Sequence, residues 1–178
     1  MQTRNVRLAL AVVAMGWAGA VAARAASADE AFEKLAAECI ENLLQARPEM
    51  ATQLGDHRFD DRLTDFGAAA LAERERTLRA QLAALEQIDV EQLTGPNRVD
   101  AEILRLELGS MLFVLTEEKP HEWNPLSYND SLATSIYLLT AREFAPAEER
   151  LRNAAKRLNE IPRVVEQIKA TLRNPPRI

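Results

Sequence analysis

AAALAERERTLRAQLAALEQ, residues 68–87, is the segment whose pattern decides the fold. Leu71, Leu78, Leu82 and Leu85 follow one another at spacings of seven, four and three residues, which places them on one side of an α-helix. Such an apolar stripe needs a partner helix to cover it. The charged residues between the leucines, expected on a solvated face of mixed charge, are Glu73, Arg74, Glu75, Arg76 and Arg79.

Helical periodicity of the same kind recurs along most of the chain. Alanine and leucine dominate, 47% of the residues are apolar and only 5% are aromatic, a composition that favours helix over strand. We therefore predict an all-α protein, an irregular bundle of about five to six helices that follows a signal peptide. The helices are expected at about residues 27–45, 68–87, 98–117, 131–139 and 146–172.

The segment 98–117 has the widest apolar face of these helices. Ile103, Leu106 and Leu112 extend its leucine stripe on both sides. We therefore expect a central, largely buried helix, with Asn97 as its N-terminal cap.

Prolines and one glycine mark the expected breaks between helices. Pro48 disfavours helix at the residue before it, so a turn region is expected to follow, with Gly55 in a left-handed conformation. Pro120 and Pro125 exclude a regular helix in their neighbourhood. Pro162 lies inside the last periodic segment and predicts a kink or a restart there.

The first 25 residues have the layout of a secretory signal peptide. Arg4 and Arg7 precede an apolar run at residues 8–23, and Ala23-Arg24-Ala25 is an Ala-x-Ala cleavage pattern. The run has 16 residues, fewer than the ~20 that a membrane-spanning helix needs, which disfavours an uncleaved anchor. We predict cleavage near Ala25, a periplasmic or secreted protein without a stable membrane anchor, and one helical segment at residues 26–178.

The charge of the chain disfavours nucleic acid as a partner. The formal net charge is −5. Removing the first 25 residues takes away three arginines and no acid, which leaves 19 basic residues against 27 acidic ones and a net charge of −8. An acidic chain lacks the concentrated positive surface that neutralises phosphates.

The sequence contains no familiar catalytic or metal-binding motif: His-Glu-x-x-His, Cys-x-x-Cys, Gly-x-Ser-x-Gly and a phosphate-binding glycine-rich loop are all missing. His57 and His121 are the only histidines, and Cys39, the only cysteine, is expected to be a small buried hydrophobe. Trp123 and Tyr128 are expected to bury their rings against helix ends. We therefore assign no catalytic residue, no metal ligand and no cofactor to this chain.

The strongest functional lead is the segment Met50–Asp65, where a histidine lies among aspartates. The candidate residues, for a cleft or a family signature, are Gly55, Asp56, His57, Arg58, Asp60 and Asp61. The aspartates lack the glycine and terminal glutamate of an EF-hand calcium loop. His57 is interpreted as a turn histidine bonded to a neighbouring aspartate or carbonyl. The alternative is a polar residue lining a cleft that a larger protein builds.

Three segments together resemble the amino-terminal part of the bacterial "domain of unknown function 885" family: ATQLGDHRFDDRL at residues 51–63, WNPLSY at 123–128 and RLNEIP at 157–162. The resemblance covers about residues 31–176. It implies a mostly helical, exported or lipoprotein-type protein considerably longer than this chain, similar to zinc metallopeptidases of the His-Glu-x-x-His kind. It thus implies zinc and a peptide substrate for the full-length protein.

No zinc ligand or catalytic base can be carried over, because this sequence ends before the region where that motif would lie. The first hypothesis is therefore the amino-terminal segment of an exported metallopeptidase-like protein, inactive alone. The second is a free-standing periplasmic helical module that binds a peptide or partner through an exposed apolar face. The third is a small hydrolase built on His57 and the aspartates.

Overall fold

The structure, a computed structural model, describes residues 28–173, and the signal-peptide prediction lies outside them. Within this range the chain forms helices and turns without any strand, which confirms the all-α prediction. A first helix is present at residues 28–46. The helices that follow are α2 (Pro48–Leu54), α3 (Ala68–Glu86), α4 (Gly95–Phe113), α5 (Pro120–Trp123), α6 (Pro125–Ala141) and α7 (Ala147–Thr171).

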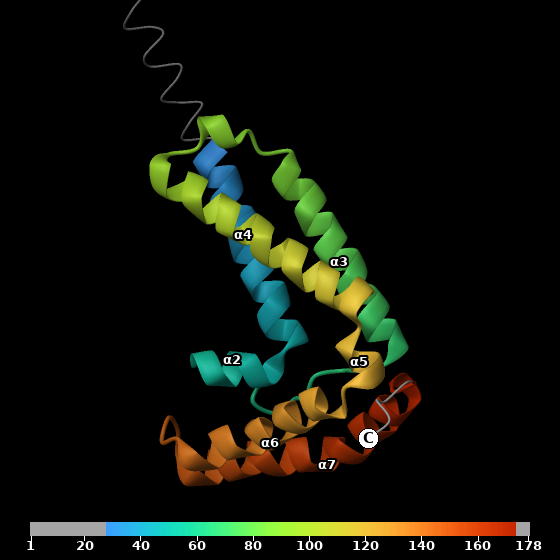
Figure 1. Ribbon diagram of the computed structural model, residues 1–178. Helices are drawn as coiled ribbons and strands as arrows, with labels where there is room; N and C mark the ends of the chain where they lie inside the picture. Colours follow the sequence, from blue (N-terminus) through green and yellow to red (C-terminus); the bar gives the residue numbers. More distant parts are fainter. Residues whose placement is uncertain (1–27, 174–178) are drawn as a thin grey trace, which may run out of the picture.

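The helices form an upper part and a foot (Figure 1). The first helix, α3 and α4 run alongside one another in the upper part, where Phe32, Leu85 and Ala101 share one buried cluster. Helices α6 and α7 lie side by side across the foot, with α2 packed on α6. A separate cluster, including Tyr128 and Val164, holds the foot together. The turn that follows α2 therefore lies where the two parts meet.

Helix α3 follows the predicted boundaries closely, and its leucine stripe is the inward face. Leu78 and Leu85 are buried, and Arg79 forms an exposed ion pair with Glu75 at 2.8 Å, as a solvated face requires. The prediction is wrong for Arg74, which is half-buried and has its Nε atom sealed from solvent. The reason is its spacing, because residue 74 lies between residues 71 and 78 on the inward side of the helix.

Helix α4 is not the central helix that its apolar residues predict. Ala101 and Leu108 are its buried residues, whereas Ile103 and Leu106 are 52% and 72% exposed. The first helix and α3 cover one face of α4, and nothing in the described part of the chain covers the opposite face. Thr94 is the N-cap in place of Asn97, whose amide donates to Asp29 Oδ1 at 2.9 Å.

The prolines begin helices here where the sequence pattern predicted that they would prevent them. Pro48, Pro120 and Pro125 each lie in the first turn of a helix, where a missing N–H leaves no bond unmade. The segment Met50–Leu54 is therefore helical, contrary to the expected turn, and α6 starts earlier than predicted. Helix α7 continues through Pro162 without a restart. Gly55 has a φ of 91°, which confirms its left-handed conformation.

The three side chains expected to be buried differ in their exposure. Cys39 is buried, as expected, and burial raises the pKa of its thiol. Tyr128 is also buried and donates its hydroxyl to the carbonyl of His121 at 2.6 Å. Trp123 donates its indole N–H to the carbonyl of Glu118, at the end of the preceding helical segment, at 2.9 Å, but its side chain stays 42% exposed, so only the expected burial of the ring is wrong. Each helix within residues 28–173 is too short or too polar to cross a bilayer.

Candidate functional site

The predicted signature forms a compact turn directly after α2. Helix α2 ends at Gly55, whose N–H bonds back to the carbonyl of Thr52 at 3.2 Å. The short 3₁₀ helix His57–Phe59 follows, and the Asp56 side chain caps it by accepting from the Arg58 N–H at 3.2 Å. Glycine is needed at residue 55 because a side chain disfavours a positive φ. The local sequence thus turns the chain back under α2.

A buried arginine on α7 holds this turn in place. Arg157 is fully buried, although arginine is rarely found away from solvent unless its donors are satisfied. Its Nε donates to the carbonyl of Arg62 at 2.9 Å, and its Nη1 donates to the carbonyl of Ser135 on α6 at 2.6 Å. Its Nη2 donates to Thr52 Oγ1 on α2 at 2.7 Å. One guanidinium therefore joins α2, the turn, α6 and α7.

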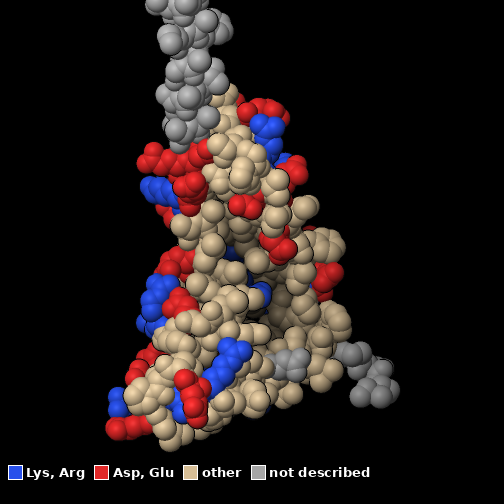
Figure 2. Space-filling model, turned by 90° about the vertical axis from the view of Figure 1, so that its left-hand side faces the viewer, with Lys and Arg blue, Asp and Glu red and all other residues tan. Residues whose placement is uncertain are grey.

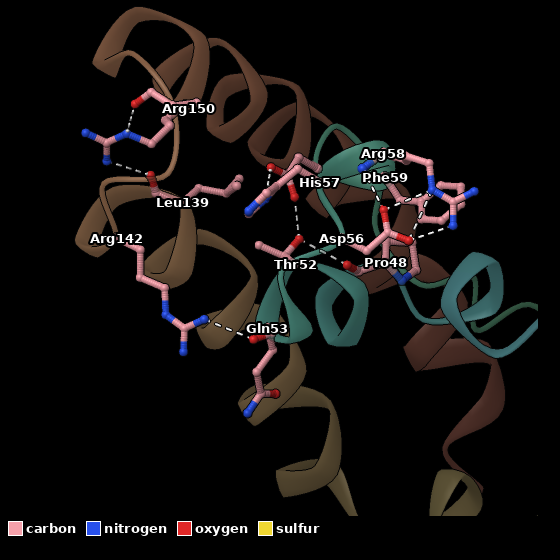
Figure 3. A network of polar contacts seen from close by, with 12 residues as sticks. Pro48, Thr52, Gln53, Asp56, His57, Arg58, Phe59, Leu139, Arg142 and Arg150 are labelled. Carbon is pink, nitrogen blue, oxygen red and sulfur yellow. Dashed lines mark hydrogen bonds and ion pairs between the residues drawn. The ribbon is translucent and has the colours of Figure 1, made fainter. Parts of the chain in front are cut away.

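The network continues from Thr52 to the histidine (Figure 3). Thr52 Oγ1 is 2.6 Å from Asp60 Oδ1, to which it donates. The second oxygen of Asp60 lies 2.9 Å from His57 Nδ1. The His57 ring stacks on Phe144 from the loop between α6 and α7, with ring centroids 3.6 Å apart. The prediction of a turn histidine bonded to a neighbouring aspartate is confirmed.

The charges of this network balance inside the protein. Burial lowers the pKa of Arg157, and the negative charges of Glu49 and Asp60 oppose that effect. The Asp60 side chain is 2% exposed, and both its oxygens have hydrogen-bonding partners. A carboxylate that is sealed and doubly bonded is poorly placed to take a proton from a substrate. The geometry favours a fastening role for Asp60 over acid–base chemistry.

The remaining signature residues face outward and tie the turn to two other helices. Arg58 Nη2 lies 2.7 Å from Glu41 Oε2 on the first helix and 2.6 Å from Asp56 Oδ2. These hydrogen bonds lower the pKa of both carboxyls. Asp61 pairs with Lys156 on α7 at 3.2 Å. Exposed pairs of this kind fix geometry and add little stability.

The turn also borders a shallow surface depression of about 530 Å³. Its lining mixes charges of both signs: Asp61, Arg62, Leu63, Asp65, Lys156, Asn159, Glu160 and Arg163. The acids and bases of this surface pair with one another, as Arg163 does with Glu160 at 2.8 Å. The depression therefore presents little unpaired charge to a ligand.

The described residues do not fit a zinc ion. Among the side chains that the structure describes, no three of histidine, cysteine, aspartate or glutamate lie close enough together to hold a metal. His57 is engaged with Asp60, and His121 lies elsewhere, on α5. A protein zinc site needs three or four such ligands around one point. We therefore derive no metal-dependent step from these residues.

Sequence reasoning identified the turn but missed the residue that organises it. Arg157 entered only as part of the RLNEIP resemblance. The buried positions of α7 are Ala154, Arg157, Val164 and Ile168, whereas Leu158 is 51% exposed. The signal available in the sequence was the position of Arg157, a charged residue that lies three residues after Ala154 and seven before Val164, at the spacing of a buried helix face.

Two comparisons with known proteins bear on this site. Residues 48–178 match the model of a family described as bacterial protein of unknown function, DUF885. A solved structure of a candidate lipoprotein of unknown function from Shewanella oneidensis is 28% identical, with a TM-score of 0.75 over 81% of this chain. This chain spans 26% of that protein. No curated protein matches.

Proposed function

Because the chain belongs to the bacterial DUF885 family of proteins of unknown function, we propose that it is a helical segment of a longer exported protein that resembles zinc metallopeptidases. In this proposal residues 26–178 are a scaffold, and the zinc and the peptide substrate of the longer protein are bound elsewhere. The signal peptide at residues 1–25 directs it to the periplasm or outside the cell. The chain alone is inactive.

The observation that carries the scaffold role is the inward direction of one polar network, to which the signature residues His57 and Asp60 belong. Arg157, Thr52, Asp60 and His57 direct their polar groups at one another and join helices distant in sequence. Groups arranged in this way position backbone, whereas a catalytic acid or base needs access to a substrate. The match to about a quarter of the Shewanella protein supports a longer whole.

The uncovered apolar side chains support the same proposal. Val99, Ile103, Leu106 and Phe113 recur at helical spacing on α4 and are each more than half exposed. We call these four residues the α4 stripe. Contiguous apolar surface of this kind marks an interaction site in a soluble protein. In a longer family member, further chain would pack on it.

The proposal is tested by measuring zinc content and peptidase activity of purified residues 26–178, side by side with a longer family member that contains His-Glu-x-x-His. We expect zinc and hydrolysis only for the longer protein. One equivalent of zinc together with hydrolysis by the short chain would refute the scaffold role. Export is tested separately by fusing residues 1–30 to alkaline phosphatase, which is active only after export, with Arg4 and Arg7 changed to glutamate as the control.

The α4 stripe also favours a second function, a free-standing module that binds a peptide or partner protein through this face. The two functions predict different behaviour for Leu106→Glu introduced into a longer family member. A scaffold that packs internally loses stability in the longer protein. A binding module keeps its stability and loses its partner.

A further inference from the structure

The α4 stripe has the spacing of a seam between two paired helices. Its four residues follow one another at steps of four, three and seven, which is the heptad repeat by which one helix packs along another. They are between 52% and 72% exposed. Ser110 occupies the remaining position of the repeat and is also exposed, so no charged side chain interrupts the seam. The stripe therefore offers a continuous face for one more helix.

The packing of the upper part uses the other side of α4. Leu108 shares a buried cluster with Cys39 of the first helix and Leu78 of α3. Ala101, seven residues before Leu108, belongs to the other buried cluster of the upper part. A helix whose apolar residues occupy two opposite faces can bury the second face only against an additional element. The fold as described thus uses one apolar face of α4 and leaves the stripe open.

Acidic side chains flank the stripe. Asp100 and Glu107 lie along one edge of it, are exposed, and form neither an ion pair nor a side-chain hydrogen bond with any residue in the range 28–173. Glu102 lies along the other edge, and its carboxylate is 3.5 Å from the guanidinium of Arg105. Figure 2 shows, on the upper part, several acidic side chains that stand on uncharged surface apart from any basic one. The open edge of the stripe therefore carries negative charge that the described chain leaves unpaired.

This charge argues against a second copy of the chain as the occupant. In a pair of α4 helices joined along their stripes, Glu107 would face an acid of the other copy in either orientation. That acid would be Glu102 if the helices were parallel and Glu107 if they were antiparallel. Like charges at the edges of a helix pair disfavour it, whereas opposite charges select the partner. The stripe is consequently suited to a helix with basic edges.

We propose that the α4 stripe docks one amphipathic helix from the remainder of a longer family member. The apolar residues of that helix recur at heptad spacing, and it carries lysine or arginine beside Asp100 and Glu107. This inference rests on the proposed function, which supplies the longer protein. The match to only 26% of the Shewanella protein shows that such a protein has ample further chain for this helix.

The test uses three labelled synthetic peptides as long as α4. The basic peptide has leucine at the heptad positions and lysine along both edges, the acidic peptide has glutamate in place of each lysine, and the reordered peptide has the composition of the basic one without an apolar face. Fluorescence anisotropy measures their binding to residues 26–178. We expect the basic peptide to bind at least about tenfold more tightly than the acidic one, with a difference that shrinks in high salt, and the reordered peptide not to bind.

Two results of this titration would overturn the proposal. If the basic peptide did not bind, or bound no better than the reordered one, the stripe would not be a seam for a helix. If the basic and acidic peptides bound equally, the acidic edge would not select the partner.

Variants locate the binding on α4. Leu106→Glu should abolish the binding of the basic peptide, and Asp100→Lys combined with Glu107→Lys should reverse the preference in favour of the acidic peptide. The matched control is Glu38→Lys combined with Glu86→Lys, two exposed acids of the first helix and α3, which changes the net charge equally and should keep the preference. An unchanged preference in the α4 variant, or a reversal in the control, would contradict the assignment.

The source of the helix is tested with a longer family member. Its own helix should fill the site, so the basic peptide should bind the short chain and not the longer protein. Equal binding by both would overturn the internal source and identify a separate partner. Dimerisation of residues 26–178 that Leu106→Glu abolishes would identify a second copy and would overturn the proposal as well. Zinc content and hydrolysis decide the scaffold role separately, so failure of one proposal is distinguishable from failure of the other.

Discussion

Replacing Arg157 by methionine should remove a large part of the free energy of unfolding of this chain. The substitution keeps the apolar stem and removes donors that now lie 2.6 to 2.9 Å from the carbonyls of Ser135 and Arg62 and from Thr52 Oγ1. It also leaves the buried Asp60 carboxylate without its nearest buried cation. Removing one partner of a buried charge network costs about 3 to 5 kcal/mol. A domain of this size has a free energy of unfolding of about 5 to 15 kcal/mol.

Urea unfolding of residues 26–178, followed by circular dichroism, measures this loss as a shift of the midpoint. The matched control on the same helix is Arg152→Met, which removes an exposed ion pair with Glu148 at 3.0 Å and should cost less than about 1 kcal/mol. Thr52→Val removes the hydroxyl between Arg157 and Asp60, so its effect should not add to that of Arg157→Met. The fastening role would be refuted if the free energy of unfolding of Arg157→Met lay within about 1 kcal/mol of that of the parent chain, which is the loss expected of the exposed control.

Other predictions address separate parts of the structure. Burial raises the pKa of Tyr128 to about 12, so its contribution to stability is complete below pH 10, the ordinary value, and is lost as the pH rises from 10 to 12. Unfolding measured across that range should show the loss, and Tyr128→Phe should remove it. Gly55→Ala should lower the free energy of unfolding by about 1 to 2 kcal/mol, because a Cβ meets no neighbour there but φ is 91°. Gly109→Ala inside α4 should raise it by about 0.5 to 1 kcal/mol, and equal effects of the two changes would contradict the conformational argument. Leu106→Glu should reduce the binding of an apolar dye without lowering the urea midpoint, because its side chain is 72% exposed; a lowered midpoint would show that this side chain packs in the short chain.

The sequence was sufficient for the fold class and for α3, because both depend on local periodicity. It failed where contacts between distant helices determine the structure. Pro120 and Pro125 were expected to prevent helices, but a proline in the first turn loses no bond, and whether it begins a helix depends on what covers that helix afterwards. The burial of α4 was overestimated for a related reason. A wide apolar face shows how much surface could be covered, and Leu106 remains exposed because no described helix lies over it.

The candidate site was found at the right place, but its interpretation changed. His57 and Asp60 are only three residues apart, so their hydrogen bond could be anticipated from short-range turn chemistry. Thr52 and Arg157 are 105 residues apart, and only the packing of α2 and α7 on the same helix, α6, brings them together. The turn consequently looked like an isolated cluster of polar groups. In the structure it is one end of a buried network that crosses the foot of the molecule.

The two inward arginines give opposite expectations for the same substitution, and this contrast tests the reasoning as a whole. Each occupies a position where the helix spacing favours an apolar residue, so each loses hydration on folding. Arg157 regains hydrogen bonds from within the protein, and Arg157→Met should therefore be strongly destabilising. Arg74 gains no such bond from the described residues, so Arg74→Met should leave the short chain equally or more stable in urea. If Arg74→Met instead destabilised the chain as much as Arg157→Met, Arg74 would have internal partners, and the contrast between the two arginines would be wrong.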